Sequence, residues 1–245
     1  MKTVLITGCS SGYGLDTARH FLAKGWQVIA TMRTPQADLF PPSPNLRVLA
    51  LDVTRADSMA NAIDKMGPVD VLVNNAGIGL FGAFEATPMA TVREIFDTNT
   101  FGTMAMCQAL IPQFRARRAG TIVNVTSSAT LAPFPLVACY TASKAAIEGF
   151  TASLALELQA FNVTVKLVEP GYGPSTRFAS NGQHRMQGLI PDAYQAYAQD
   201  VFASFSAVEA VTIGADVAKV IWQAAQDQSG QLRFPAGPDA VALAA

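Results

Sequence analysis

Residues 3–14 of this chain read TVLITGCSSGYG, and this stretch decides the fold. Residues 3–7 have the apolar character of a buried strand, and residues 15–24 have a helical pattern. A strand, a glycine turn and a helix start therefore coincide. Such a turn presents free backbone N–H groups and the positive end of a helix dipole to an anion, and glycine lets a pyrophosphate approach closely. A surface turn with three chance glycines is the alternative, which this context disfavours.

A second informative stretch places Tyr140 and Lys144 one helical turn apart. Residues four apart share one face of a helix. A Tyr hydroxyl titrates near pH ~10 when unperturbed, and a nearby cation favours the phenolate. We therefore expect Lys144 to lower the pKa of Tyr140 and to make the phenol a usable general acid or base. An exposed helix face is the alternative, and the glycine stretch upstream argues for chemistry.

Strand and helix signals alternate along the chain. Strands are predicted near 3–7, 27–31, 46–51, 69–73, 120–126 and 163–168, with a last one near 232–235. Helices are predicted at about 14–24, 55–66, 88–117, 140–160 and 213–227. The alternation indicates a parallel sheet with right-handed crossovers, and a 50% apolar composition suits a sheet covered on both faces. A length of 245 residues favours one domain, residues 1–245.

Residues 171–207 break this alternation. They mix apolar side chains with glycine and proline over a stretch longer than an ordinary connection. A loop of that length in a compact domain is often a lid, and loops beyond the carboxyl ends of strands build the binding edge of open α/β sheets. We therefore predict a helical substrate lid at about 171–207. The alternative is a helical flap that merely completes the fold.

Charge, cysteine and histidine content argue against several classes of protein. A net charge of −1 gives no electrostatic case for nucleic acid or an anionic membrane. Cys9, Cys107 and Cys139 form neither a disulfide framework nor a metal pattern, which favours a reducing cytoplasm. His20 and His184 show no metal spacing, so no metal is expected.

Two features argue against export and against a membrane anchor. The first predicted strand begins within a few residues of Met1, which leaves no room for a signal peptide. Residues 119–143 carry no charge, but Asn124, a Ser/Thr run and two prolines interrupt them. This stretch fits a buried strand and an active-site loop better than a membrane span. We therefore expect a soluble, cytoplasmic protein.

The end of the second predicted strand indicates the type of nucleotide. An acidic residue there holds the adenosine ribose hydroxyls and repels a 2′-phosphate. Thr31 takes that position in this chain, and Arg33 follows within reach of a phosphate, to which a guanidinium offers a planar fork of donors. We therefore favour NADP(H) over NAD(H). The alternative is that Arg33 is simply solvated at the start of a loop.

Four motifs in sequence order carry a family resemblance. They are the GxxxGxG loop of residues 8–14, Asn74-Asn75-Ala76-Gly77 after apolar residues 69–73, Ser127, and the Tyr140/Lys144 pair. Through them, from Lys2 to about Ala240, the chain resembles the short-chain dehydrogenase/reductases. The resemblance implies a Rossmann-type doubly wound parallel α/β sheet of about seven strands, in the order 3-2-1-4-5-6-7, flanked by helices.

The resemblance also implies catalytic roles. Tyr140 would donate a proton to the carbonyl in reduction and accept one in alcohol oxidation. Lys144 would lower the pKa of Tyr140 and bind the nicotinamide ribose. Ser127, thirteen residues before Tyr140, would orient the substrate oxygen in preference to Ser128. The backbone of Asn99 would help to hold a water for a proton relay to Lys144, and interruption of a helix is its alternative role.

The same resemblance implies a set of cofactor contacts. The set is Gly8, Ser10, Ser11, Gly12, Tyr13, Gly14, Arg33, Asp52, Val53, Asn75, Ala76, Gly77, Tyr140, Lys144, Pro170, Gly171 and Thr176. Asp52 would contact the adenine, with a helix N-cap as its alternative role. The segment after Gly171 is one residue longer than the family pattern, so either Ser175 or Thr176 would meet the nicotinamide carboxamide.

Together these observations predict an NADP(H)-dependent oxidoreductase acting on a ketone or a secondary alcohol. Apolar residues in the predicted lid favour an apolar substrate such as a steroid, retinoid, lipid or aromatic ketone. Epimerisation or dehydration on the same scaffold is one alternative, and a regulatory protein that senses NADP(H) without turnover is another. The helices at 88–117 and 140–160 resemble those that pair subunits in this family, which implies a homodimer or homotetramer.

Overall fold

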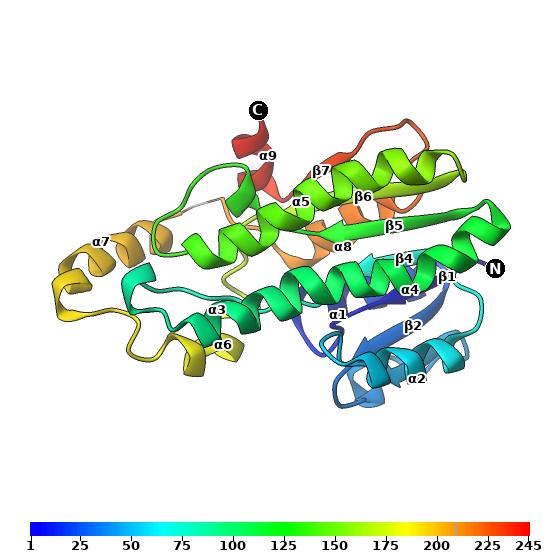
Figure 1. Cartoon of the computed structure of the whole chain (residues 1–245), viewed down its shortest axis with the longest axis horizontal. Coiled ribbons are helices and arrows are strands. Elements are labelled where there is room, and N and C mark those ends of the chain that lie inside the picture. The colour runs from blue at the N-terminus through cyan, green and yellow to red at the C-terminus, as the bar shows by residue number, and fades with distance from the viewer. Residues whose placement is uncertain (209) are drawn as a thin grey trace.

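Seven parallel strands form one sheet in the order β3-β2-β1-β4-β5-β6-β7 (Figure 1). This computed structural model describes residues 1–208 and 210–245. The strands are β1 (Thr3–Ile6), β2 (Gln27–Met32), β3 (Leu46–Ala50), β4 (Val71–Asn74), β5 (Gly120–Val125), β6 (Val163–Pro170) and β7 (Arg233–Ala236). The Rossmann-type order predicted from the sequence is confirmed. The strand order runs outward in opposite directions from β1 and from β4. The carboxyl ends of these two parallel strands are neighbours, because Ile6 pairs with Val73.

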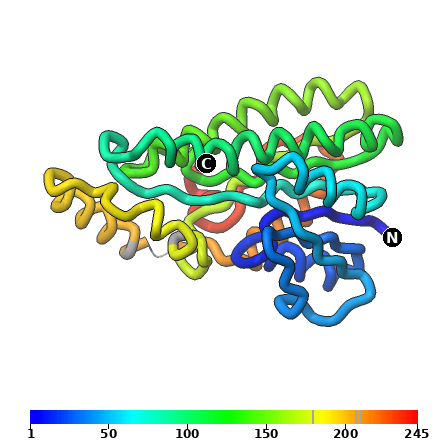
Figure 2. The backbone as a smooth tube through the Cα atoms, turned by 60° about the horizontal axis from the view of Figure 1, so that its bottom comes forward, coloured from blue at the N-terminus to red at the C-terminus, as the bar shows by residue number. Residues whose placement is uncertain are grey.

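Helices cover both faces of this sheet, as Figures 1 and 2 show. Val4 and Ile6 pack with the first face, under α1 (Gly12–Ala23) and α8 (Gly214–Ala224). Leu5 packs with the second face, which is covered by α2 (Ala56–Met66), α4 (Gly102–Arg117) and α5 (Ala138–Gln159). Successive side chains of a strand point to opposite faces. Burial of both faces therefore explains why Val4, Leu5 and Ile6 of β1 are all apolar.

The helix predicted at 88–117 is not continuous. It consists of α3 (Met89–Phe96), a π-helical turn (Asp97–Phe101) and α4. The turn contains Asn99, whose side chain bonds to the backbone of Ile78 on a neighbouring loop. The expectation of one regular helix was therefore wrong at this point, because a tertiary contact overrides the local helical pattern.

The stretch 171–207, which we call the lid segment, contains two helices. They are α6 (Phe178–Met186) and α7 (Gln195–Ser206), joined through a short turn (Asp192–Tyr194). Figures 1 and 2 show both helices at one end of the molecule, the end toward which β5 runs. Leu189, between the helices, is buried, and its carbonyl accepts the N–H of Ala83 at 2.9 Å. The lid segment is thus attached to the loop that follows β4.

The remaining elements are short. Three 3-10 turns lie at Ala37–Leu39, Phe84–Ala86 and Ser128–Thr130. A last helix, α9 (Pro238–Ala244), follows β7 and was not predicted. Within residues 1–208 and 210–245, no helix combines the length and the apolar character that a membrane crossing requires.

Candidate active site

The glycine loop between β1 and α1 packs too closely for side chains. A Cβ at Gly8 would lie 2.8 Å from the Cα of Ala76, and one at Gly14 would lie 2.3 Å from the carbonyl oxygen of Gly8. Gly8 and Gly12 also have positive φ, at 75° and 55°. Ser11, the N-cap of α1, makes no side-chain capping bond, and no acidic residue occupies the first turn. The first N–H groups of α1 therefore suit an anion.

Thr7 and Asn75 hold this loop against the turn after β4. The Thr7 hydroxyl accepts the N–H groups of Asn75 and Ala76, both at 3.0 Å. The Asn75 amide donates to the carbonyls of Thr7, at 3.0 Å, and Gly8, at 3.2 Å. In this structure the side chain of Asn75 supports the glycine loop. Thr7 was overlooked as a site residue, because the sequence shows it only as the last residue of an apolar strand.

The structure corrects the interpretation of Thr31 at the end of β2. Its side chain is buried and its hydroxyl donates to the carbonyl of Ile6 at 2.9 Å, so it does not occupy the position of a ribose-binding acid. Met32, also buried, ends the strand, and Arg33 after it is exposed. No acidic side chain therefore stands at this strand end. Arg33 remains the group there that suits a phosphate.

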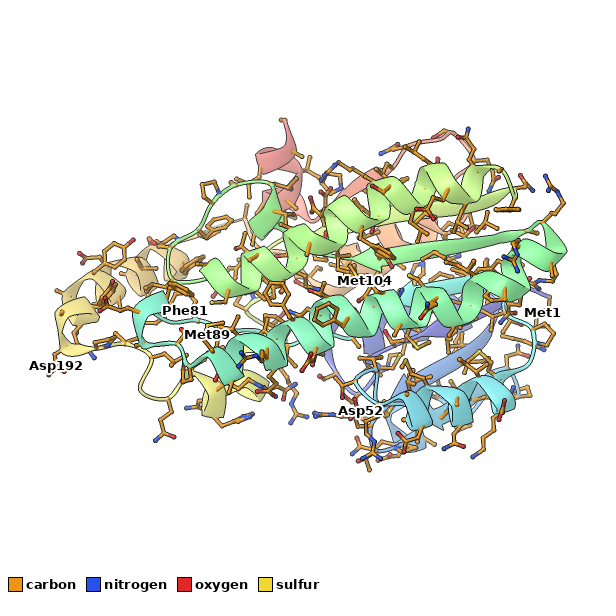
Figure 3. The ribbon with its side chains drawn as sticks, in the orientation of Figure 1. Met1, Asp52, Phe81, Met89, Met104 and Asp192 are labelled. Carbon is orange, nitrogen blue, oxygen red and sulfur yellow. The ribbon has the colours of Figure 1, made fainter. Side chains whose placement is uncertain are left out.

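Asp52, which is labelled in Figure 3, belongs to a turn before α2 and is close enough to Arg33 for their charges to interact. Its Oδ1 accepts the N–H of Thr54 at 2.9 Å and the hydroxyl of Thr54 at 2.7 Å. Burial opposes ionisation of Asp52, but these bonds and the charges of Arg33 and Arg55 hold its pKa below the ordinary value. Arg55 is the N-cap of α2, so Asp52 does not have the alternative N-cap role. The neighbouring Val53 packs on Gly102 at the start of α4.

Ser127, Tyr140, Lys144 and Asn99 come together at the carboxyl edge of the sheet. A hydrogen bond joins the hydroxyls of Ser127 and Tyr140. A Cβ at Gly77 would lie 3.3 Å from Asn99 Oδ1 and 3.4 Å from Lys144 Nζ, so this glycine leaves room for both groups. The structure thus places the four predicted catalytic residues around the turn after β4, together with Ala76 and Gly77.

The direction of the Tyr140 pKa differs from the expectation. Burial raises the pKa of Tyr140 to about 12, and the hydrogen bond with Ser127 opposes the rise. Burial also lowers the pKa of Lys144 to about 8. The Lys144 ammonium donates to the carbonyl of Val125 at 3.0 Å. Because desolvation dominates, Tyr140 is held as a neutral phenol in this arrangement.

Asn99 bridges the π-helical turn to its surroundings. Its Oδ1 accepts the Ile78 N–H at 2.8 Å, and its Nδ2 donates to the Ile78 carbonyl at 3.0 Å and to the Ser143 hydroxyl at 3.1 Å. Its own carbonyl accepts the hydroxyl of Thr103 at 3.0 Å. π-Helical turns are common at functional sites. The residue therefore interrupts the helix and lies in the catalytic group at the same time.

The loop after Pro170 reaches the glycine loop. The Gly171 carbonyl accepts the Tyr13 hydroxyl at 3.2 Å. A Cβ at Gly12 would lie 3.6 Å from Thr176 Cβ, whereas Ser175 is exposed. Of the two candidates for the nicotinamide contact, Thr176 is therefore the one that lies against the glycine loop.

Asp239, on α9, joins the start of the lid segment to Thr212, which lies five residues after its end. Its Oδ2 accepts the N–H of Tyr172 at 2.6 Å, and its Oδ1 accepts the hydroxyl of Thr212 at 2.5 Å. The Thr212 N–H also donates to the Tyr172 carbonyl at 2.8 Å. These contacts of Asp239 were not predicted from the sequence, because the local signal at Asp239 is the start of a short helix.

Aromatic side chains gather beside Tyr140 and beneath α7, where Figure 3 labels Phe81. The ring of Phe178 stands edge-on to Tyr140, with centroids 5.6 Å apart. Phe81 contacts Phe202 at 4.9 Å, and Phe205 contacts a set of three rings. Those rings are Phe81 at 6.0 Å, Phe134 at 6.0 Å and Tyr172 at 5.5 Å. The lid segment thus brings an aromatic wall to the catalytic edge.

Comparisons with known proteins agree with this geometry. The family model for short chain dehydrogenase matches residues 2–186. Retinol dehydrogenase 8 of Bos taurus is 42% identical over 184 residues, which cover 69% of this chain and 58% of that protein's length. A short-chain dehydrogenase from Streptomyces avermitilis superposes with a TM-score of 0.82 at 32% identity, covering 99% of this chain and 90% of its own. ElxO with NADP bound superposes with a TM-score of 0.81 at 26% identity, covering 98% and 99%.

Proposed function

This chain belongs to the short-chain dehydrogenase family, and on that premise we propose that it is an NADPH-dependent oxidoreductase acting on a ketone or secondary alcohol. The observation that carries the proposal is the hydrogen bond between the Ser127 and Tyr140 hydroxyls, next to the buried Lys144. This is the arrangement that a proton transfer to a carbonyl oxygen requires.

The residues present fit a nicotinamide dinucleotide. The uncapped start of α1 and the glycines of the loop suit a pyrophosphate, and Gly77 leaves space beside Lys144. The bound cofactor would supply the hydride. Arg33 favours NADP(H), since a guanidinium suits a 2′-phosphate and no acid at the end of β2 repels one. The NADP bound to the similar ElxO supports the same choice.

Each catalytic side chain has a role in reduction. Tyr140, held protonated by burial, donates its proton to the substrate oxygen, which becomes the hydroxyl of the alcohol. The Ser127 hydroxyl bonds to the same oxygen and orients it. The Lys144 ammonium stabilises the phenolate left behind, for which it exchanges its bond to Val125. Asn99 fixes the turn that contains Ile78 next to these groups.

The aromatic wall supports an apolar substrate. Phe178 presents its ring to Tyr140, and Phe81 packs against the rings of Phe202 and Phe205 on α7. The name of the bovine relative indicates an apolar alcohol for that protein. We therefore propose one nucleotide-binding domain whose lid segment closes over a lipid-like or aromatic ketone. The three cysteines are free thiols, which fits a cytoplasmic setting.

A homodimer or homotetramer would use the outer face of α4 and α5. A groove on that face is lined by Phe101, Met104, Ala105, Gln108, Ile111, Phe150 and Leu154. Phe101 is 57% exposed and the nearby helix residue Leu156 is 74% exposed. Two copies related by a two-fold axis would bury these side chains.

The test is NADPH oxidation at 340 nm with a panel of ketones and aldehydes, for the wild type and for Tyr140→Phe, with NADH as the cofactor control. Turnover that disappears in Tyr140→Phe while NADPH binding persists would support the proposal. Tight NADPH binding without turnover of any substrate would instead favour a sensor of NADP(H).

A further inference from the structure

Two buried glutamates face one arginine behind the turn that carries Ser127. Glu148 lies on α5, one helical turn after Lys144, and Glu169 lies on β6. Arg233 of β7 donates to Glu148 Oε2 at 2.9 Å and also to Glu169 Oε1. Burial and then the charge of Glu148 raise the pKa of Glu169, against the lowering effect of Arg233.

The other oxygen of Glu148 is directed to the Ser127 turn. Oε1 accepts the hydroxyl of Thr126 at 3.3 Å and also the hydroxyl of Thr130. Thr126 precedes Ser127 at the end of β5, and Thr130 ends the 3-10 turn that Ser127 begins. The Thr130 hydroxyl also lies 2.6 Å from the Ser127 carbonyl. Glu148 therefore holds the chain on both sides of Ser127.

One face of α5 carries both Glu148, which contacts Thr126 and Thr130, and the catalytic pair Tyr140 and Lys144. Tyr140, Lys144 and Glu148 follow one another at intervals of four residues, so they lie on the same side of the helix. The phenol is thus on the same rigid element as the carboxylate that holds the serine turn. A fixed distance between the Ser127 and Tyr140 hydroxyls follows from this arrangement.

We propose that Glu148 is a positioning residue that keeps the Ser127 hydroxyl in hydrogen-bond contact with Tyr140, through the hydroxyls of Thr126 and Thr130. Arg233 holds the Glu148 carboxylate in turn and pairs with Glu169 as well. The inference rests on the proposed oxidoreductase function. A displacement of about 1 Å at a catalytic group reduces rates roughly 100-fold, so a loosened turn is expected to slow turnover without weakening cofactor binding.

A purely structural role for the cluster is the alternative, because an ion pair with a buried carboxylate joins elements whatever its location. The chain offers a matched control in Lys166 and Asp227, which pair at 2.7 Å with the lysine buried. Lys166 lies on β6, as Glu169 does, but its partners are Asp227 and the Gln231 carbonyl. Asp227→Asn therefore removes the ion pair of a buried lysine that does not touch the Ser127 turn.

The experiment compares Thr130→Val, Thr130→Ser, Glu148→Gln and Asp227→Asn, each also combined with Ser127→Ala. We expect Thr130→Val to lower kcat roughly 10- to 100-fold with the KM for NADPH within about twofold, and Thr130→Ser to restore it. In the Ser127→Ala background, Thr130→Val and Glu148→Gln should have no further effect on kcat. Asp227→Asn should lower the melting temperature and leave kcat unchanged.

A second readout does not depend on turnover. The ¹³Cζ resonance of Tyr140, assigned with Tyr140→Phe in tyrosine-labelled protein, reports the hydrogen bond from Ser127. Thr130→Val and Ser127→Ala should shift it alike, whereas Asp227→Asn should leave it in place. Equal losses of kcat from Thr130→Val in both backgrounds, or a Tyr140 resonance that Thr130→Val does not move, would overturn the inference. If the wild type turns over no ketone, the proposed function fails and the resonance alone decides the positioning role.

Discussion

The Phe178 ring lies edge-on against the Tyr140 ring, with centroids 5.6 Å apart. Phe178 is the first residue of α6, and a Cβ at Gly79 would lie 2.5 Å from its ring. The lid segment therefore contacts the catalytic phenol through one aromatic side chain, which packs against the loop after β4.

This contact predicts a role for Phe178 in substrate selection. Phe178→Ala should raise the KM for bulky apolar ketones roughly tenfold, because a ring contact is lost, and should change the KM for small ketones little. Steady-state kinetics with ketones of increasing size would measure this. Phe84→Ala, at an exposed ring on the 3-10 turn Phe84–Ala86, is the control. Equal changes for small and bulky ketones would contradict the prediction.

Arg33 is predicted to select the nucleotide. Arg33→Ala should reduce kcat/KM for NADPH roughly 10- to 100-fold, because NADPH loses its charged hydrogen bonds to Arg33. The kcat/KM for NADH should stay nearly unchanged. Arg55→Ala is a matched control, since Arg55 is an exposed arginine near Asp52 that pairs with Asp57 at 2.7 Å. A parallel loss with both nucleotides would mean that Arg33 acts elsewhere.

The buried Lys144 predicts a pH-dependent stability. Its pKa is lowered to about 8 from a model-peptide value of 10.5, so between these values the unfolded chain binds more protons and stability rises with pH. Relative to Lys144→Met, the wild type should therefore gain at most about 3 kcal/mol as the pH rises from 8 to 10.5. Urea unfolding of both proteins across this range would show it. A constant difference would show that Lys144 titrates normally.

Two glycines predict opposite outcomes for the same substitution. Gly14→Ala would force a Cβ to within 2.4 Å of the Asn75 amide, so it should destabilise the fold by about 1–3 kcal/mol and weaken NADPH binding. Gly149→Ala in α5 meets nothing within 4 Å and should stabilise by up to about 1 kcal/mol. Thermal unfolding and NADPH titration of both variants would test this. A well-tolerated Gly14→Ala would mean that the glycine loop relaxes.

The groove on α4 and α5 predicts an assembly of identical chains. Met104, labelled in Figure 3, lines it. Met104→Glu should shift the protein to a monomer, because pairing would bury an unpaired charge. Light scattering after size exclusion would measure the mass, with Val241→Glu, at a side chain 55% exposed on α9, as the control. A wild-type monomer would remove the basis of this prediction.

Local patterns were sufficient to predict the alternation of strands and helices, the parallel sheet and the main motifs, whereas the order of the strands followed from the family resemblance. The strand, the glycine turn and α1 are consecutive, and Tyr140 and Lys144 are one helical turn apart, so short-range rules apply. The π-helical turn at Asn99 was not predicted, because it depends on a bond to Ile78, 21 residues away. The burial of Thr31 was missed for a similar reason, since its partner Ile6 lies on another strand.

Charged partners far apart in the sequence were the hardest features to predict. Glu148 and Arg233 are separated by 85 residues, and Tyr172 and Asp239 by 67. Nothing in the local context of Glu148, Arg233 or Asp239 distinguishes them from solvated charges on helices and strands. The direction of the Tyr140 pKa was not predicted for a related reason. Burial raises this pKa, and burial depends on packing rather than on the spacing between Tyr140 and Lys144.

The contacts of Asp239 with Tyr172 and Thr212 have a consequence for the order in which the chain folds. Every proposed catalytic side chain lies before residue 145, but the groups that fasten the lid segment and the Ser127 turn, Asp239 and Arg233, come from the last elements of the chain. During synthesis the nucleotide half can form its sheet while the substrate side is still unfastened. Catalytic activity would then appear late and abruptly, when β7 and α9 dock. A chain that ends before residue 233 would keep its catalytic side chains but would lack the contacts that position them.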